Sequence, residues 1–428
     1  MNFELDPVSG PGAVLVEVAE KHADEFASTA EEHDRSQSFP YEHWDAMRRS
    51  GLFSASVPPR LGGLGVSSIH DLVVAVNRLG RGDASIAIGA AMHLTAIWYL
   101  SRLTADRVPE PEQAGLLALL LRRCARGHVV ACVAASEPGT SLGRPLTTAR
   151  PEGDRYRLDG RKTFCTGSPA GPVFLSTVRV VDEDSSASFG LAVVPRNTPG
   201  LSVLPNWDAM GMRASGSHDV VFDGCHVPRR MVTVSGPLGV MTTEMLPLTM
   251  VGTLLLIGAA LGIAERAQEL VASTGATLHA TAPGRIGADR PTVRRLIAEN
   301  EVDLMVARAA IERTATITDA HLTEGWAQLD RTQLHELMKE IQCVNVAAKR
   351  AAIAIVDRAL TVCGGRGYLS AHPLSRLYRD VRAGPFMQPL SMLEVFDYIG
   401  AITLGVPTEL DPAPDGSPHT PAMTSVHL

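Results

Sequence analysis

A short stretch of small residues is the first candidate for binding chemistry. Residues 135–141 read ASEPGTS and include Ser136, Gly139 and Ser141. Backbone N–H groups and small hydroxyls can approach a phosphate closely, because glycine has no side chain that keeps the anion away. Taken alone, these residues favour an ordinary β-turn, although the same small residues would also suit a loop that approaches an anion.

Proton-transfer chemistry requires a base, and the C-terminal part of the chain contains a long segment without a carboxylate. No Asp or Glu occurs between Asp380 and Glu394, where the sequence reads VRAGPFMQPLSML. The residue near the middle of this segment is Gln388, and an amide cannot accept a proton at neutral pH. An enzyme that used this segment would therefore need a base from elsewhere.

The composition is that of an ordinary globular protein. The chain has 428 residues, 45% of them apolar and 20% charged, and this length suits two or three domains. The net charge of -7 and the scattered basic residues argue against a nucleic-acid surface. The six cysteines form no CxxC pair and no zinc pattern, so we expect free thiols and no metal site. The start of the chain does not resemble a secretory signal, and the predicted location is the cytoplasm.

The pattern of elements changes twice along the chain. Residues 1–127 have the periodicity of helices, residues 128–235 are short β-branched segments between turn residues, and residues 236–403 return to long helical patterns. We predict an α+β fold with an N-terminal helical domain, a central antiparallel β barrel or sandwich, and a C-terminal four-helix bundle. The Asp-Gly pair at residues 159–160 indicates a hairpin turn. The proline-rich residues 404–428 are predicted to be a disordered tail.

One apolar run is long enough to cross a bilayer. Residues 245–263 contain no charged side chain. Glycine, threonine and proline dilute the run, and no basic residues flank its start. We therefore predict a helix buried on all sides within the bundle and no membrane contact.

Five stretches of the chain resemble the motifs of one known family. In order over residues 50–385 they are GLFSASVPPRLGGLG, ASEPGTS, LDGRKTFCTG, GMRASGSHDVVFDGCHVP, and CGGRGYL followed by LYRDVRAG. Each stretch alone is a weak signal, but five in the correct order are a strong one. The chain resembles the acyl-CoA dehydrogenase family of flavoenzymes.

This resemblance implies a cofactor and an assembly. An FAD would lie between the β domain and the C-terminal bundle, at a site that a neighbouring subunit completes, so a homo-oligomer (a dimer or a tetramer) is expected. Residues 135–141 would lie against the flavin and its phosphates. Thr166 would bond the reactive flavin nitrogen, and Phe164 replaces a tryptophan that covers the ring. Gly364 and Gly365, in the retained CGGRGYL loop, are further cofactor-binding candidates.

The chain departs from the family pattern at four positions of the implied site. Most of the family has its base where this chain has Gln388, and some relatives have it on the apolar helix, where this chain has Gly252. The arginine that reaches the neighbour's FAD diphosphate is missing, and Arg285, several residues later, is the nearest substitute. The glutamine before the glycine pair is Thr361. We therefore expect a weaker hold on FAD and an unusual or relocated base.

Our main interpretation is an FAD-dependent oxidoreductase that acts on an acyl thioester, on CoA or on a carrier protein, with a relocated base. The nearest carboxylates that could serve are Glu244, Glu394 and Asp397. Each of them also fits an ordinary carboxylate on a helix surface.

One alternative is a flavin monooxygenase of the same fold, which uses reduced flavin and O2 and needs no such base. The stretches FCTGSP and RASGSHDV look more like that branch, and FMN could then replace FAD. His93, Ser217 and His218 would be candidates for steering the reaction, although such histidines are more often structural. A further alternative is one subunit of a heteromeric acyl-CoA dehydrogenase whose partner supplies the base. A non-catalytic homologue has no specific feature in its favour.

Overall fold

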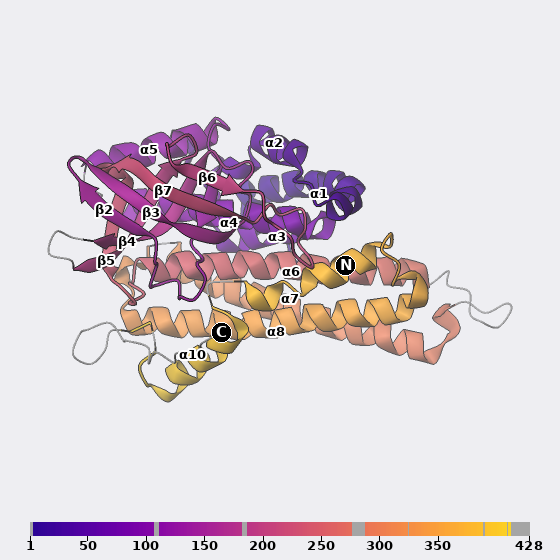
Figure 1. Ribbon diagram of the computed structural model, residues 1–428. Helices are drawn as coiled ribbons and strands as arrows, with labels where there is room; N and C mark the ends of the chain where they lie inside the picture. Colours follow the sequence, from indigo (N-terminus) through magenta and orange to yellow (C-terminus); the bar gives the residue numbers. More distant parts are fainter. Residues whose placement is uncertain are drawn as a thin grey trace, which may run out of the picture.

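The computed structural model describes residues 3–106, 111–181, 186–275, 287–323, 325–387, 390–408 and 410–411. The N-terminal helices and the β domain lie on one side of the long helices of the C-terminal part (Figure 1). The predicted α+β architecture of helical domain, β domain and helical bundle is confirmed.

The N-terminal part consists of five helices: α1 (Gly10–Ser36), α2 (Tyr41–Ser50), α3 (Ile69–Gly82), α4 (Ala84–Asp106) and α5 (Pro111–Ala125). Serine side chains fix the starts of two of them. Ser9 accepts a hydrogen bond from the backbone N–H of Gly12 in α1, and Ser68 accepts one from that of Asp71 in α3. Helix α3 is buried along almost its whole length, because it packs between α1 and the C-terminal helices.

The β domain is one sheet of eight strands: β1 (Ala131–Ala134), β2 (Thr148–Glu152), β3 (Arg155–Cys165), β4 (Val173–Val181), β5 (Ala187–Pro195), β6 (Leu201–Leu204), β7 (His218–Pro228) and β8 (Val232–Pro237). The strand order is β6-β7-β3-β2-β4-β5-β8, and β1 pairs with β4. The sheet is mixed rather than purely antiparallel, because both β1 and β2 run parallel to β4.

The parallel pairings explain where the ASEPGTS stretch lies. Strand β1 pairs with the first half of β4 and β2 with its last residues, so both occupy the same edge of β4. Residues 135–147, which connect β1 to β2, therefore leave the sheet in the middle of that edge. The fold presents this loop at a break between two strands rather than in a tight turn.

The predicted hairpin turn at residues 159–160 is wrong. Strand β3 continues through Asp159 and Gly160, with a bulge in its pairing with β7 at that point. A Cβ on Gly160, which has φ +155, would lie within 2.7 Å of Thr147. The glycine is thus required for the close approach of the 135–147 loop and not for a turn.

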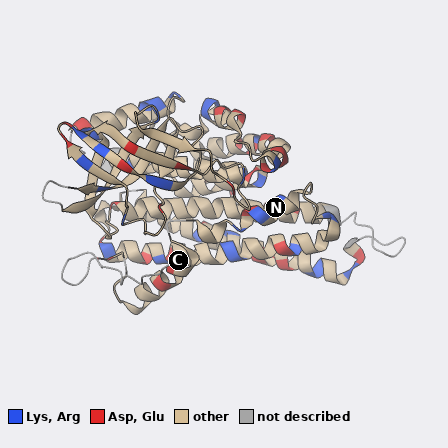
Figure 2. Ribbon diagram, in the orientation of Figure 1, with Lys and Arg blue, Asp and Glu red and all other residues tan. Residues whose placement is uncertain are grey.

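The C-terminal part contains α6 (Met245–Gly275), α7 (Pro291–Leu322), α8 (Arg331–Cys363), α9 (Pro373–Val381) and α10 (Met392–Leu404). Within the described residues, two helices are long and apolar enough to cross a membrane: Ala84–Leu103 of α4 and Met245–Ser273 of α6. They are 89% and 94% buried inside the protein, as predicted for the apolar run in α6. Figure 2 agrees, since most of α6 carries no charge.

Part of the predicted C-terminal tail is bound to the bundle. After α10, Thr408 is 4% exposed, and the backbone N–H of Met241 donates to the carbonyl oxygen of Leu410 (2.9 Å). Arg331 at the start of α8 donates to Asp411 (2.8 Å) and to the Met241 carbonyl (2.6 Å). The chain is therefore held as far as Asp411, and residues 412–428 lie outside the described part.

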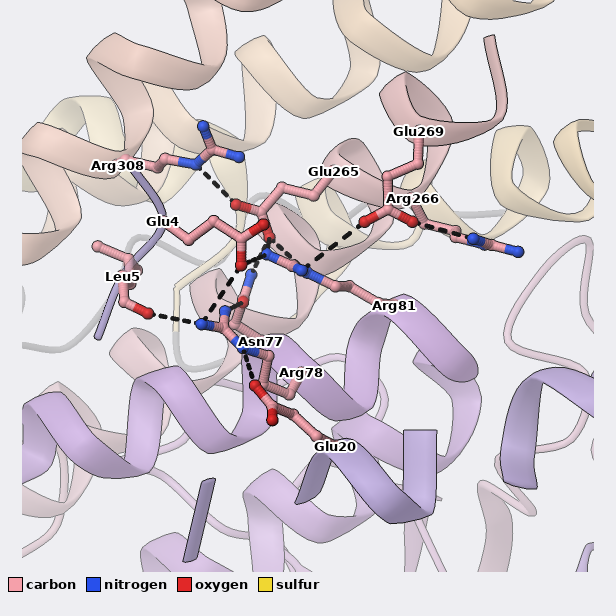
Figure 3. A network of polar contacts seen from close by, with 10 residues as sticks. All are labelled: Glu4, Leu5, Glu20, Asn77, Arg78, Arg81, Glu265, Arg266, Glu269 and Arg308. Carbon is pink, nitrogen blue, oxygen red and sulfur yellow. Dashed lines mark hydrogen bonds and ion pairs between the residues drawn. The ribbon is translucent and has the colours of Figure 1, made fainter. Parts of the chain in front are cut away.

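A network of polar contacts joins the N-terminal helices to the bundle (Figure 3). At its centre Glu265 of α6, 2% exposed, accepts from Asn77 (2.8 Å) and Arg81 (2.9 Å) of α3 and from Arg308 of α7 (2.8 Å). Glu4, near the N-terminus, also pairs with Arg81 (2.9 Å). A buried carboxylate with this many donors fixes how the two helical parts meet.

Candidate active site

The 135–147 loop is held in place by a buried ion pair. Glu137 Oε1 lies 2.7 Å from Nζ of Lys162 on β3, and the two side chains are 2% and 0% exposed. The same carboxylate accepts from the backbone N–H groups of Leu146 and Thr147 and from the Thr147 hydroxyl (2.5 Å). Thr177 of β4 accepts from Lys162 (2.9 Å).

These contacts set the ionisation of the pair. Burial alone would raise the pKa of Glu137, but Lys162 and the hydrogen bonds outweigh it and lower that pKa. Burial lowers the pKa of Lys162, and Glu137 opposes the change. The pair therefore stays charged and anchors both ends of the loop to the sheet.

The tip of the loop is open to solvent. Gly139 has φ +74, and a Cβ at this position would meet no atom within 4 Å. Ser141 is exposed, and Ser136 is tied to β3 through its carbonyl, which accepts from the backbone N–H of Thr163 (2.9 Å). An anchored loop with an open, small-residue tip fits the phosphate-binding role that the sequence predicts.

The end of β3 presents an aromatic ring and a chain of hydroxyls. Thr166 Oγ1 lies 3.0 Å from Ser217 Oγ, which lies 2.6 Å from Ser215 Oγ. Phe164 adopts φ 55 and is 65% exposed, with its ring edge-on to Trp207 at a centroid distance of 5.8 Å. A non-glycine residue held at positive φ with an exposed ring is unusual, and this conformation keeps Phe164 on the surface where a planar cofactor can stack.

Trp44 of α2 forms the wall behind Thr166. A Cβ on Gly167 would lie 2.4 Å from the Trp44 ring, and a Cβ on Gly89 of α4 would lie 2.6 Å from it. The indole is 4% exposed, and its N–H has no hydrogen-bond partner among the described residues. Only glycine at these two positions lets the ring pack behind the hydroxyl chain.

Helix α9 locks the β domain against the bundle. Arg379 donates to Asp34 of α1 (2.8 Å), and Asp380, 0% exposed, accepts from the backbone N–H of Met212 (2.6 Å). Burial raises the pKa of Asp380 to about 7, although Arg376 at 3.6 Å opposes the change. The Arg-Asp pair of the sequence motif therefore has a structural role here.

The carboxylates considered as bases have other contacts or lie on the surface. Glu394 caps α10: its side chain accepts from the backbone N–H of Ser391 (2.6 Å). Asp397 is exposed on the same helix. Glu244 precedes α6 and accepts from the hydroxyl of Thr243 (3.4 Å). No contact in the described structure joins any of them to Thr166.

The histidine candidates are also engaged. His93 is 0% exposed: its Nδ1 accepts from the backbone N–H of Ala131 (2.9 Å), and its Nε2 lies 2.8 Å from the Phe53 carbonyl oxygen. Burial lowers the pKa of His93 to about 4, so the ring is neutral and serves packing. His218 accepts from the backbone N–H of Trp207 (2.9 Å), and burial lowers its pKa.

The remaining predicted residues do not meet the loop within one chain. Gly364 and Gly365 are exposed and follow the last residue of α8. The first turn of α8 is bonded to Met241, on the β-domain side, so the glycine pair lies at the opposite end of the helix (Figure 1). Gln388 and Arg285 lie outside the described residues. The structure thus groups Ser136, Gly139 and Ser141 on one loop, and Thr166 with Ser217, and leaves the glycine pair at a separate end.

Comparison with known proteins shows similarity along nearly the whole chain. The amino sugar nitrososynthase DnmZ of Streptomyces peucetius is 33% identical over 407 residues, which are 94% of this chain and 96% of that one. The L-evernosamine nitrososynthase of a Micromonospora species is 32% identical, with 95% and 93% covered.

A solved structure of KijD3 in complex with FMN and dTDP-3-amino-2,3,6-trideoxy-4-keto-3-methyl-D-glucose matches with a TM-score of 0.88 at 32% identity, covering 96% of this chain and 98% of that one.

Family models describe the same relationship domain by domain. The acyl-CoA dehydrogenase N-terminal, middle and C-terminal domains match residues 13–108, 132–225 and 254–388. The similar proteins include two nitrososynthases, and the KijD3 structure contains FMN. This chain is a flavin-dependent oxidoreductase that belongs to the acyl-CoA dehydrogenase family.

Proposed function

We propose that this protein is a flavin-dependent monooxygenase that oxidises the amino nitrogen of a nucleotide-linked amino sugar. Two relatives that match over more than nine-tenths of the chain are nitrososynthases, DnmZ for amino sugars and the enzyme for L-evernosamine. The matching KijD3 structure carries a dTDP-linked amino sugar together with FMN. This function replaces acyl-thioester oxidation, our first interpretation from the sequence, as the preferred hypothesis.

The lack of a carboxylate base is the observation that carries the proposal. Removing a proton from carbon in an acyl thioester needs a base, whereas an amine nitrogen reacts through its own lone pair once it is unprotonated. The segment between Asp380 and Glu394 offers no carboxylate, and α6 has Gly252 at the alternative position. Neither of the two positions where the family has its base therefore has a carboxylate in this chain, as expected for chemistry at nitrogen.

The position of Gly252 offers a polar group to a substrate instead. A Cβ at residue 252 would lie 3.5 Å from the methyl carbon of Thr95 on α4. The Thr95 hydroxyl is buried and has no hydrogen-bond partner among the described residues. An unpaired buried hydroxyl is costly, so a sugar hydroxyl or carbonyl that bonded it would gain affinity.

The described residues fit a flavin. The 135–141 loop would hold its phosphate, Phe164 would cover its ring, and the hydroxyl of Thr166, oriented by Ser217, would lie at its edge. When bound and reduced, the flavin supplies two electrons, so that one oxygen atom of O2 enters the substrate and the other leaves as water. Trp44 and the surrounding core exclude water from behind the site.

FMN is the preferred cofactor in this proposal, and the enzyme is a homo-oligomer. FMN lacks the adenosine monophosphate half of FAD, and with it the diphosphate that Arg285 was predicted to contact, and KijD3 carries FMN. Large exposed apolar residues surround the end of α8 and the connection to α10, among them Tyr368 (81%), Phe386 (72%) and Leu393 (85%). A second copy that covered them would bury this apolar surface in a subunit interface.

The test supplies purified protein with FMN or FAD, a flavin reductase, NADH, O2 and a dTDP-linked 3-amino sugar. We expect O2-dependent formation of the hydroxylamine and then the nitroso product, each detected by mass spectrometry. Thr166→Val should slow the reaction, while Thr166→Ser should retain most of it. Anaerobic bleaching of bound flavin by an acyl thioester, with no oxygenated amine formed, would overturn the proposal.

A further inference from the structure

Two histidines and a glutamate meet where helix α1 ends and helix α2 begins. His33 lies in the last turn of α1, and Glu42 and His43 lie in the first turn of α2. Their ligand atoms all lie within 4.8 Å of one another. Among the described residues, this is the one group of three His, Cys, Asp or Glu side chains that is close enough to hold a metal ion. None of the three belongs to the candidate active site.

The separations of the ligand atoms suit a tetrahedral metal ion. Zn²⁺ binds imidazole nitrogen and carboxylate oxygen at about 2.0–2.2 Å, so its ligand atoms lie about 3.4 Å from one another. Glu42 Oε1 lies 2.6 Å from Nε2 of His33 and 3.9 Å from Nε2 of His43, on either side of that value. The Glu42 side chain is 57% exposed, so it can shift between the two rings without disturbing the core.

The hydrogen bonds behind His33 decide which of its nitrogens carries a proton. The Ser36 hydroxyl donates to the Glu32 carbonyl (2.7 Å), so the Ser36 oxygen must accept from the Ser38 hydroxyl (2.8 Å). Because the single proton of Ser38 is used there, its oxygen must accept from the Nδ1–H of His33 (2.7 Å). A neutral His33 therefore has its lone pair on Nε2, the atom that faces Glu42.

The short contact between His33 and Glu42 needs a positive charge. A neutral Nε2 would direct its lone pair at a carboxylate oxygen 2.6 Å away, and the two would repel each other. A second proton on His33 supplies the charge when no metal is bound, and a metal ion can replace that proton. Burial lowers the pKa of His43, so this second ring offers a neutral imidazole near the same oxygen.

His43 can give up its present hydrogen bond without leaving a group unpaired. Its Nε2 lies 2.6 Å from the hydroxyl oxygen of Thr29, which also lies 3.5 Å from the Phe26 carbonyl oxygen. When Nε2 binds a metal ion, the hydroxyl can donate to that carbonyl. The lone pair of His43 is therefore available to a ligand.

Zinc fits this set of ligands better than calcium or magnesium does. Ca²⁺ and Mg²⁺ prefer six or more oxygen ligands, whereas imidazole suits Zn²⁺. Three protein ligands leave the fourth position to water, which can enter on the exposed side of Glu42. We expected no metal site from the sequence because its cysteines fit no zinc pattern, and this cluster contains no cysteine.

We propose that His33, Glu42 and His43 bind one Zn²⁺ ion, which joins the end of α1 to the start of α2. Only residues 37–40 separate the two helices, which lie side by side (Figure 1). Trp44 follows His43 on α2 and forms the wall behind the hydroxyl chain of the candidate active site. The ion thus has a structural role: it holds in place the helix that carries this wall.

The first experiment titrates ZnCl2 into the whole, chelator-treated protein by isothermal titration calorimetry. We expect one Zn²⁺ per chain, and both His33→Gln and Glu42→Gln should weaken its binding roughly 100-fold or more, because each removes a ligand. Glu25→Gln is the matched control. Glu25 is 58% exposed and lies 3.3 Å from His22, but it belongs to no group of three ligands in the described structure, so Zn²⁺ binding should stay unchanged.

Two further measurements test the geometry and the choice of metal. Ser38→Ala removes the acceptor that orients His33 and should weaken Zn²⁺ binding about 10-fold. Zn²⁺ at 100-fold above its Kd should raise the Tm of wild type by about 3 °C and leave that of Glu42→Gln unchanged. Mg²⁺ and Ca²⁺ at the same concentration should not change the Tm of either protein.

The outcomes separate this site from other places where zinc could bind. Loss of binding in both ligand variants, with binding retained in Glu25→Gln, supports the proposal. No saturable Zn²⁺ binding, or binding of wild-type strength in His33→Gln and Glu42→Gln, would overturn it. Equal stabilisation by Mg²⁺ would overturn it as well. If His33→Gln does not fold, the exposed Glu42→Gln decides. None of these measurements depends on the oxidation of an amine, so the site and the proposed function can fail independently.

Discussion

Two buried lysines of this protein have opposite surroundings. Lys162 in the β domain is fully buried, with Glu137 at 2.7 Å and the Thr177 hydroxyl at 2.9 Å. Lys349 in the bundle is almost as buried, and no described residue pairs with it. Removing an ammonium group from water costs roughly several kcal/mol at both positions. Neighbouring groups offset this cost only at Lys162.

The charge on Lys162 has a structural role, whereas the fold offers no reason for a charge on Lys349. Burial lowers the pKa of both lysines, and only at Lys162 does a carboxylate raise it again. Lys162 therefore stays charged and fixes the 135–147 loop. Burial lowers the pKa of Lys349 to about 8, and this unpaired lysine stabilises nothing in the fold.

Lys162→Met should have the largest effect on stability. It removes the cation and leaves the Glu137 carboxylate buried without its partner, which costs about 3–5 kcal/mol. We expect this loss in the free energy of unfolding from chemical denaturation, together with a loss of bound flavin. The double variant Glu137→Gln with Lys162→Met removes both charges and should recover much of the loss. A double variant no more stable than Lys162→Met would show that packing, and not the charge, explains the effect.

Lys349→Met should act in the opposite direction and stabilise the protein by roughly 3 kcal/mol at neutral pH, from a pKa change of 10.5 to about 8. The unfolded chain binds this proton more tightly than the folded one. Wild-type stability should therefore fall as pH decreases from about 10.5 to about 8, and the full penalty is present below that. In Lys349→Met this part of the pH dependence should disappear in denaturation experiments.

Lys339→Met is the matched control for that gain in stability. Lys339 lies on the same helix and pairs with Glu336 on the surface, so its replacement should change stability by roughly 0.5 kcal/mol or less. A similar gain in both variants would mean that methionine simply favours helix α8. A loss of stability in Lys349→Met would mean that an unseen partner satisfies the ammonium.

The sequence was sufficient to predict the order of the helical domain, the β domain and the helical bundle. Helical periodicity located the long helices, and five ordered motifs identified the family. The sequence did not predict that β1 and β2 share one edge of β4, because parallel pairing depends on long-range contacts that local sequence patterns do not show. The same holds for Leu410 and Asp411, whose partner Arg331 lies 80 residues before Asp411.

The candidate site was predicted in part for similar reasons. Thr166 and the 135–141 loop were predicted as site residues because they lie inside motifs, and their roles stay predictions. Glu137 and Lys162 were missed as a pair: each lies in a motif, but an alternating strand gives no sign that a lysine points inward. Lys349 was missed because charged residues on a long helix ordinarily face solvent, and its 4% exposure in the structure shows that it does not.

Around Lys162, Thr177→Val should have a smaller effect than Lys162→Met and show how much of the Lys162 environment is essential. The substitution keeps the shape of a side chain that is 4% exposed and removes the hydroxyl that accepts from Lys162. Because Glu137 still neutralises the ammonium, we expect a loss of about 1.5 kcal/mol in chemical denaturation, the lower value for a hydrogen bond to a charged group. Thr177→Ser, which keeps the hydroxyl, should lose less. If Thr177→Val lost as much as Lys162→Met, the hydroxyl and not the carboxylate would be the essential partner, and the contrast with Lys349 would rest on hydrogen bonding instead of on charge.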